Sequence, residues 1–63
     1  MDTEFREMMF SRMPRELDIL RSAAANFSRD ANNALIMCRL YFPGLPTAKA
    51  RCFLQWLSVQ RVY

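Results

Sequence analysis

The stretch that decides the fold is residues 13–41, MPRELDILRSAAANFSRDANNALIMCRLY. Within it, apolar residues follow one another at steps of four and three. This spacing places them on one side of an α-helix and is typical of helices that pack side by side in a coiled coil or bundle. These residues are named the seam: Met13, Leu17, Leu20, Ala24, Phe27, Ala31, Ala34, Cys38 and Tyr41.

The seam predicts one long central helix over residues 14–42, because no glycine or proline follows Pro14 before Pro43. Pro14 fits the first turn of such a helix, where its missing N–H costs nothing. The helix would be about 43 Å long, too long for one small chain to cover, so we expect a homodimer formed through the seam. The alternative is a break near residues 28–30, with Asp30 capping a separate helix from Ala31 to Tyr41.

The flanking segments complete an all-α chain in a single domain over residues 1–63. Acidic residues near the start favour a short first helix over residues 3–12. The turn at 43–46 contains two prolines and Gly44, which can adopt positive φ, so it ends the central helix. We expect Thr47 to cap a final helix over residues 48–61, which packs back on the central one.

The composition argues against catalysis. The chain has no histidine and no glycine-rich loop, so the commonest general base and a phosphate cradle are both missing. Its two cysteines, Cys38 and Cys52, have no activating partner in the sequence and are too few for a zinc site. We therefore expect a protein that is not an enzyme and that uses no cofactor and no metal.

The apolar content is high for such a short chain, at 52% of 63 residues. A core this small is marginally stable by itself, and a contiguous apolar patch left outside it usually marks an interaction site. No segment is long enough for a membrane span, and the N-terminus lacks the pattern of a signal peptide. We expect a cytoplasmic protein with reduced thiols that binds another protein.

Two segments are candidate partner-binding surfaces. The first helix has methionines and phenylalanines accompanied by acids, a combination that suits a basic protein surface. The last helix contains two large aromatic residues, which are enriched in binding hot spots, although core packing is the favoured interpretation for them. The candidates are Phe5, Glu7, Met9, Phe10 and Glu16 in the first half, and Phe53 and Trp56 in the second.

The charge distribution keeps a DNA-binding regulator open as an alternative. The net charge is +3, and residues 31–63 contain four basic residues and no acid. The basic residues are scattered rather than clustered, which argues against direct DNA binding. A further alternative is an inhibitor of a host protein or a peptide that acts at a membrane surface, because the last helix is basic and aromatic.

The chain resembles the very small regulatory proteins of lambdoid prophages, among them antirepressors of the Gifsy type. The resemblance covers the whole short helical chain and includes the Met8-Met9-Phe10 segment and the Phe42-Pro43-Gly44-Leu45-Pro46 break. It assigns no role to any single residue. It implies a protein that binds a phage repressor stoichiometrically and keeps it off its operator DNA.

Overall fold

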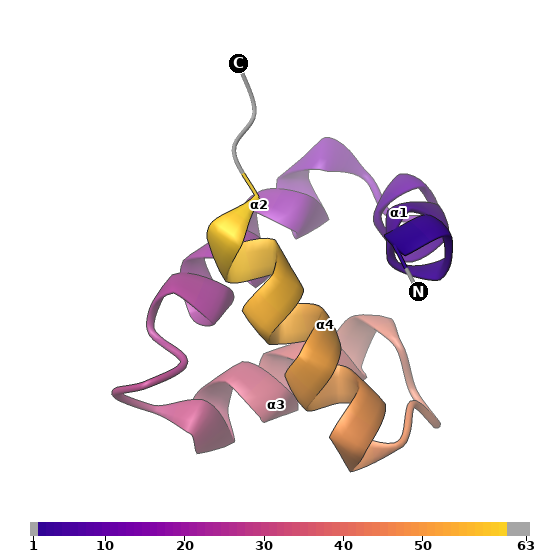
Figure 1. Cartoon of the computed structure of the whole chain (residues 1–63). Helices are drawn as coiled ribbons and strands as arrows, with labels where there is room; N and C mark the ends of the chain where they lie inside the picture. Colours follow the sequence, from indigo (N-terminus) through magenta and orange to yellow (C-terminus); the bar gives the residue numbers. More distant parts are fainter. Residues whose placement is uncertain (1, 61–63) are drawn as a thin grey trace.

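Residues 2–60 fold into four helices joined by short connections (Figure 1). The computed structural model describes residues 2–60. Helix α1 covers Asp2–Phe10, α2 covers Pro14–Ala25, α3 covers Ala31–Tyr41 and α4 covers Thr47–Val59. These residues contain no strand, which confirms the all-α prediction. The predicted end of the last helix at residue 61 lies outside the described residues.

The predicted long helix over residues 14–42 is wrong, because the chain turns between α2 and α3. The carbonyl oxygen of Asn26 accepts hydrogen bonds from the N–H groups of Arg29 and Asp30, at 3.0 and 2.8 Å. The Asp30 carboxylate accepts from the N–H of Asn33 at 3.2 Å and caps α3. Such a cap stabilises a helix by about 1 kcal/mol. The alternative with a break before Ala31 is therefore the observed structure.

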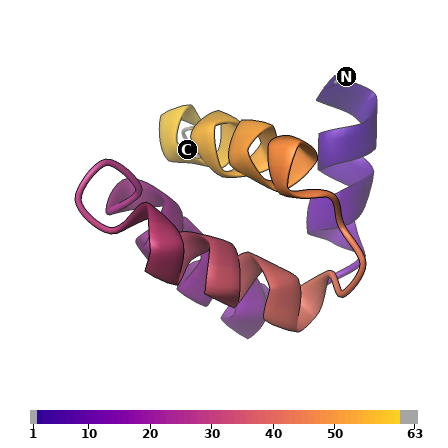
Figure 2. The same cartoon turned by 90° about the horizontal axis from the view of Figure 1, so that it is seen from below.

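The turn allows one chain to cover its own apolar side chains. α3 folds back beside α2, and α4 crosses over the pair (Figure 2). The molecule measures 26 × 25 × 21 Å, shorter in every direction than the roughly 43 Å rod that a continuous helix requires. Its radius of gyration of 10.4 Å is close to the roughly 10.6 Å expected for a compact chain of this length.

The helix ends follow from local chemistry. Pro14 occupies the first turn of α2, as predicted, and the Glu16 carboxylate accepts from the N–H of Met13 at 3.1 Å. Gly44 adopts a φ of +88°, which L side chains rarely adopt. The prediction that Thr47 caps the last helix is wrong: Pro46 occupies the cap position, and the Thr47 hydroxyl accepts a hydrogen bond from Arg39.

Phe53 on α4 lies at the centre of the core. Its ring centroid is 5.5 Å from those of Phe5 on α1 and Phe42 after α3, and 6.2 Å from that of Trp56. Aromatic pairs at these separations add stabilisation beyond the area they bury. This cluster joins α1 and the end of α3 to α4. The buried residues are Phe5, Leu17, Leu20, Ala23, Ala24, Ala34, Cys38, Ala50, Phe53, Leu54 and Leu57.

Phe53→Ala should unfold the chain. Truncating a buried phenylalanine costs about 3–5 kcal/mol, which is as much as a core of this size supplies. Phe10→Ala is the matched control, since Phe10 is 79% exposed, and it should retain the wild-type helical signal. Circular dichroism during urea titration measures both. A folded Phe53→Ala variant with unchanged midpoint would contradict the central role of this ring.

Candidate functional site

Six large apolar side chains remain exposed among residues 2–60. Two of them, Phe10 and Met13, lie on either side of the connection between α1 and α2 and are named the corner patch. Three others lie on the outer side of α2 and α3, and Val59 lies at the end of α4. The six are Phe10, Met13, Ile19, Ile36, Leu40 and Val59. Apart from Val59, the exposed apolar side chains of residues 2–60 therefore form two surfaces outside the core.

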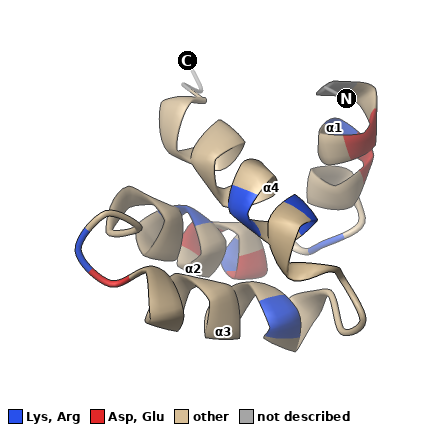
Figure 3. Ribbon diagram, turned by 60° about the horizontal axis from the view of Figure 1, so that its bottom comes forward, with Lys and Arg blue, Asp and Glu red and all other residues tan. Residues whose placement is uncertain are grey.

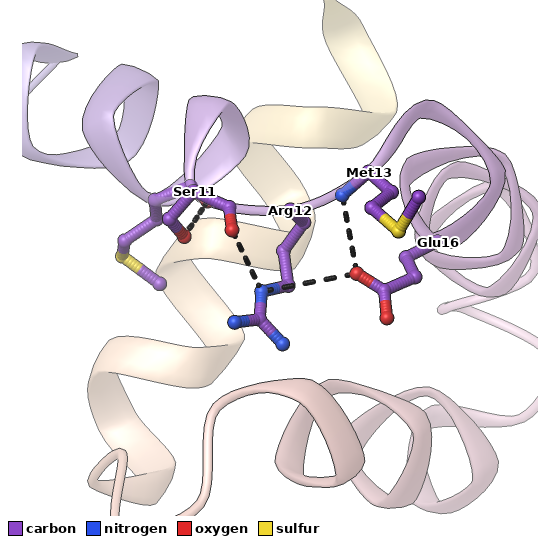
Figure 4. A network of polar contacts seen from close by, with 5 residues as sticks. Ser11, Arg12, Met13 and Glu16 are labelled. Atoms are coloured by element: carbon purple, nitrogen blue, oxygen red, sulfur yellow. Dashed lines mark hydrogen bonds and ion pairs between the residues drawn. The ribbon is translucent and has the colours of Figure 1, made fainter.

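The corner patch is held by a network of polar contacts (Figure 4). The Ser11 hydroxyl donates to the carbonyl of Met8 at 2.6 Å, and Arg12 Nε donates to the carbonyl of Ser11 at 3.2 Å. The hydrogen bond between Met13 and Glu16 fixes the start of α2. Phe10, 79% exposed, and Met13, 61% exposed, are thus presented by a structured turn.

The acids beside this patch are partly engaged within the chain. The Glu16 carboxylate lies 3.9 Å from Arg12 Nε, and the Arg12 guanidinium lies 5.7 Å from the centre of the Phe42 ring. Glu4 pairs with Lys49 on α4 at 2.8 Å, and this hydrogen bond and the lysine's charge hold the pKa of Glu4 below its usual value. Glu7 is exposed and forms no ion pair with any other described residue.

The second surface is a shallow groove between α2 and α3, named the α2–α3 face. The groove has a volume of about 380 Å³. Ile36 and Leu40 form an exposed apolar ridge on α3 beside it, at 50% and 63% exposure. Asp18 is the one charged residue of its lining. The lining residues are Asp18, Ile19, Ser22, Ala23, Asn26, Asn33 and Met37.

This face was not among the sequence candidates, although a signal for it exists. Asn33, Ile36, Met37 and Leu40 follow the i, i+3, i+4, i+7 spacing of a second stripe on α3. The seam residues lie on the other side of the same helix. An 11-residue helix with apolar residues on two sides cannot bury both in a chain this small.

The structure places most of the seam inside the chain. Leu17, Leu20, Ala24, Ala34 and Cys38 are buried in the core, and Phe27, Ala31 and Tyr41 are half-buried. Met13 alone of the nine seam residues is exposed. The spacing identified the buried side of each helix, but the covering helices belong to the same chain. A dimer of the folded chain therefore needs another surface.

The predicted partner-binding residues fall into two groups. Phe5 and Phe53 are buried against each other, and Trp56 and Met9 are half-buried, as the core interpretation of the aromatic residues expects. Phe10 and Glu7 are exposed on α1, and Glu16 is half-buried in the corner. This second group lies at the surface around the corner patch, whereas Trp56 and Met9 are only partly accessible.

A second hollow lies between α1 and the turn before α4. It has a volume of about 480 Å³ and is spanned by the Glu4–Lys49 ion pair. Its titratable side chains are Tyr41 and the paired Glu4 and Lys49. Its lining consists of Glu4, Met8, Tyr41, Phe42, Pro43, Gly44, Leu45, Pro46 and Lys49.

The described residues contain no group of three His, Cys, Asp or Glu side chains that could hold a metal ion. None of the helices in residues 2–60 combines the length and the apolarity needed to span a membrane. Comparison of the chain with protein-family models, with curated proteins and with solved structures finds no match. The two apolar surfaces are therefore the features of the chain that bear on its function.

The two thiols should react very differently. Cys52 is exposed on α4, whereas burial raises the pKa of Cys38 to about 11. Because the thiolate is the reactive form, a chromogenic disulfide reagent at pH 8 should modify one thiol per chain, and two in denaturant. Modification of both in the native chain would contradict the buried position of Cys38.

The same shift predicts a loss of stability at high pH. The folded chain holds the Cys38 proton more tightly than the unfolded chain does, so this contribution is complete below the ordinary thiol pKa and is lost as the pH rises through about 11. Cys38→Ala should remove this part of the alkaline dependence in urea titrations. A wild-type dependence in the Cys38→Ala variant would assign the effect to another group.

Proposed function

We propose that the chain acts without catalysis, by stoichiometric binding of another protein through the corner patch. The observation that carries this proposal is the exposure of Phe10 on a structured turn. At 79% it is the most exposed large apolar side chain of the described residues. Exposing a phenylalanine gives the folded chain no hydrophobic stabilisation, while large aromatic side chains supply much of the binding energy at protein interfaces.

The setting of Phe10 supports a binding role. The hydrogen bonds of Ser11 and Met13 restrict the turn before any partner arrives, which lowers the conformational entropy lost on binding. The exposed charges nearest to it in the sequence have both signs, with Arg6 and Glu7 before it and Arg15 after it. An apolar centre with a charged rim is the usual anatomy of a protein interface.

The partner that we propose is a DNA-binding repressor. This choice rests on the resemblance to small lambdoid prophage regulators and on the absence of histidine and glycine-rich motifs from the sequence. Glu7, which has no ion-pair partner among residues 2–60, suits a basic surface such as the one a repressor presents to DNA. Binding there would keep the repressor from its operator, as an antirepressor does.

A DNA-binding regulator is the second candidate. Arg39 is the one charged residue of α3, and Lys49 and Arg51 are those of α4 (Figure 3). Phosphate contacts are the main source of affinity for DNA. Lys49, however, is already paired with Glu4, which leaves Arg39 and Arg51 as the cations of α3 and α4 without an ion pair among residues 2–60.

The proposal predicts that Phe10→Ala weakens release of a repressor from its operator. Fluorescence anisotropy of labelled operator DNA, saturated with a lambdoid prophage repressor, should fall to the free-DNA value at about one chain per repressor protomer. Phe10→Ala should weaken this effect at least tenfold, since hot-spot truncation costs about 2 kcal/mol or more.

Val59→Ala is the matched control, because Val59 is 69% exposed at the end of α4, and it should act as wild type. Equal activity of the Phe10→Ala and Val59→Ala variants would rule out the corner patch. A salt-sensitive rise in the anisotropy of operator DNA without repressor would instead support direct DNA binding. No release with any repressor of a representative panel would argue against the proposed partner class.

A further inference from the structure

We infer that the α2–α3 face binds a second copy of the chain and forms a two-fold symmetric dimer. The face has a hollow and a ridge side by side. Ile19 and Ala23 on α2 and Met37 on α3 line the hollow, and Ile36 and Leu40 form the ridge. α4 crosses the opposite side of this helix pair (Figure 2). α4 thus does not cover the face. The face is also separate from the core, in which most of the seam residues are buried.

A second copy fits because a surface with a ridge beside a hollow is complementary to itself. The turn after α2 reverses the chain, so α2 and α3 run side by side in opposite directions (Figure 2). A two-fold axis parallel to these helices places α3 of each copy over α2 of the other. Each ridge then enters the other copy's hollow, as helix ridges pack into grooves, and the same patch is used twice.

The charges of the face support this arrangement. Asp18 lies on the α2 edge of the hollow, near the start of that helix. Arg39 lies near the end of α3, two residues after Met37 and therefore on the side of α3 away from the hollow. The two-fold axis brings Arg39 of one copy to the same end of the interface as Asp18 of the other, twice, and the guanidinium exchanges its hydrogen bond to Thr47 for the partner's carboxylate in the dimer. No acid of α3 opposes Asp18, because α3 contains none (Figure 3).

The size of the face is sufficient. A standard interface takes about 800 Å² from each partner, about a fifth of the 4455 Å² that the chain exposes. α2 has 12 residues and α3 has 11, more than a third of the described chain. Sedimentation should therefore show a monomer–dimer equilibrium.

Sedimentation velocity of the full chain tests the dimer. The wild type should shift from monomer to dimer between about 1 µM and 1 mM. Leu40→Glu should raise the dissociation constant at least about tenfold, because it places a charge in the apolar contact. Val59→Glu adds the same charge at an equally exposed position on α4 and should leave the dissociation constant unchanged. Circular dichroism confirms that each variant is folded.

A charge exchange tests the orientation. Asp18→Arg and Arg39→Asp should each weaken the dimer, and the double variant should regain most of the lost affinity, since the pairing is restored with its sign reversed. A chain that stays monomeric at 1 mM, or that forms trimers, overturns the proposal. So does a dimer weakened by Val59→Glu but not by Leu40→Glu. Failure of the double variant to recover affinity overturns the two-fold arrangement.

Discussion

The turn between α2 and α3 is the constraint on which the remaining structure depends. Two N–H groups donate to the Asn26 carbonyl, and the Asp30 carboxylate caps the next helix. These few hydrogen bonds convert what would be a rod into two antiparallel helices. Once the helices lie side by side, Leu20 and Ala24 face the same interior as Ala34 and Cys38. The seam folded upon itself therefore supplies most of the part of the core that comes from α2 and α3.

Phe53 and its neighbours on α4 complete the core that the turn between α2 and α3 brings together. The folded-back pair leaves one side open, and α4 covers it with Ala50, Phe53, Leu54 and Leu57. The Phe53 ring also contacts the aromatic side chains that come from α1 and from the end of α3. One residue therefore links segments that are far apart in sequence. α1, held through Phe5 and the Glu4–Lys49 pair, depends on this contact for its position.

Sequence patterns predicted the features that depend on a few neighbouring residues. They missed the features that depend on how the helices pack against one another. Pro14 has a fixed φ and Gly44 can adopt a positive φ, so the start of α2 and the turn before α4 could be predicted. The a/d spacing identified the buried residues from Leu17 to Cys38, but it does not say whether the covering helix belongs to the same chain. The step from Phe27 to Ala31 keeps the helical phase across the turn, which hides the break.

The exposed residues of the candidate site could likewise be predicted only in part. Phe10 lies off the buried side of its helix, so its exposure follows from spacing alone. Met13 belongs to the seam by spacing, and only the position of the turn before Pro14 moves it to the surface. Ile36 and Leu40 share a helix whose opposite side is buried. Their exposure follows from the number of neighbours available to cover α3, a property of the whole chain that no local pattern contains.

The two exposed surfaces are chemically different, which indicates different occupants. The α2–α3 face has a single charged residue in its lining, Asp18, and amide side chains at one end. A self-complementary contact uses such a surface well, because each copy buries little charge. The corner patch instead has exposed Arg6 and Glu7 one turn before Phe10, and desolvating them is favourable only with matching charges opposite.

In a two-fold dimer through α2 and α3, α1 stays on the side of α4, away from the interface (Figure 2). Each dimer would then present two corner patches related by its two-fold axis. This arrangement suits a partner that is itself two-fold symmetric.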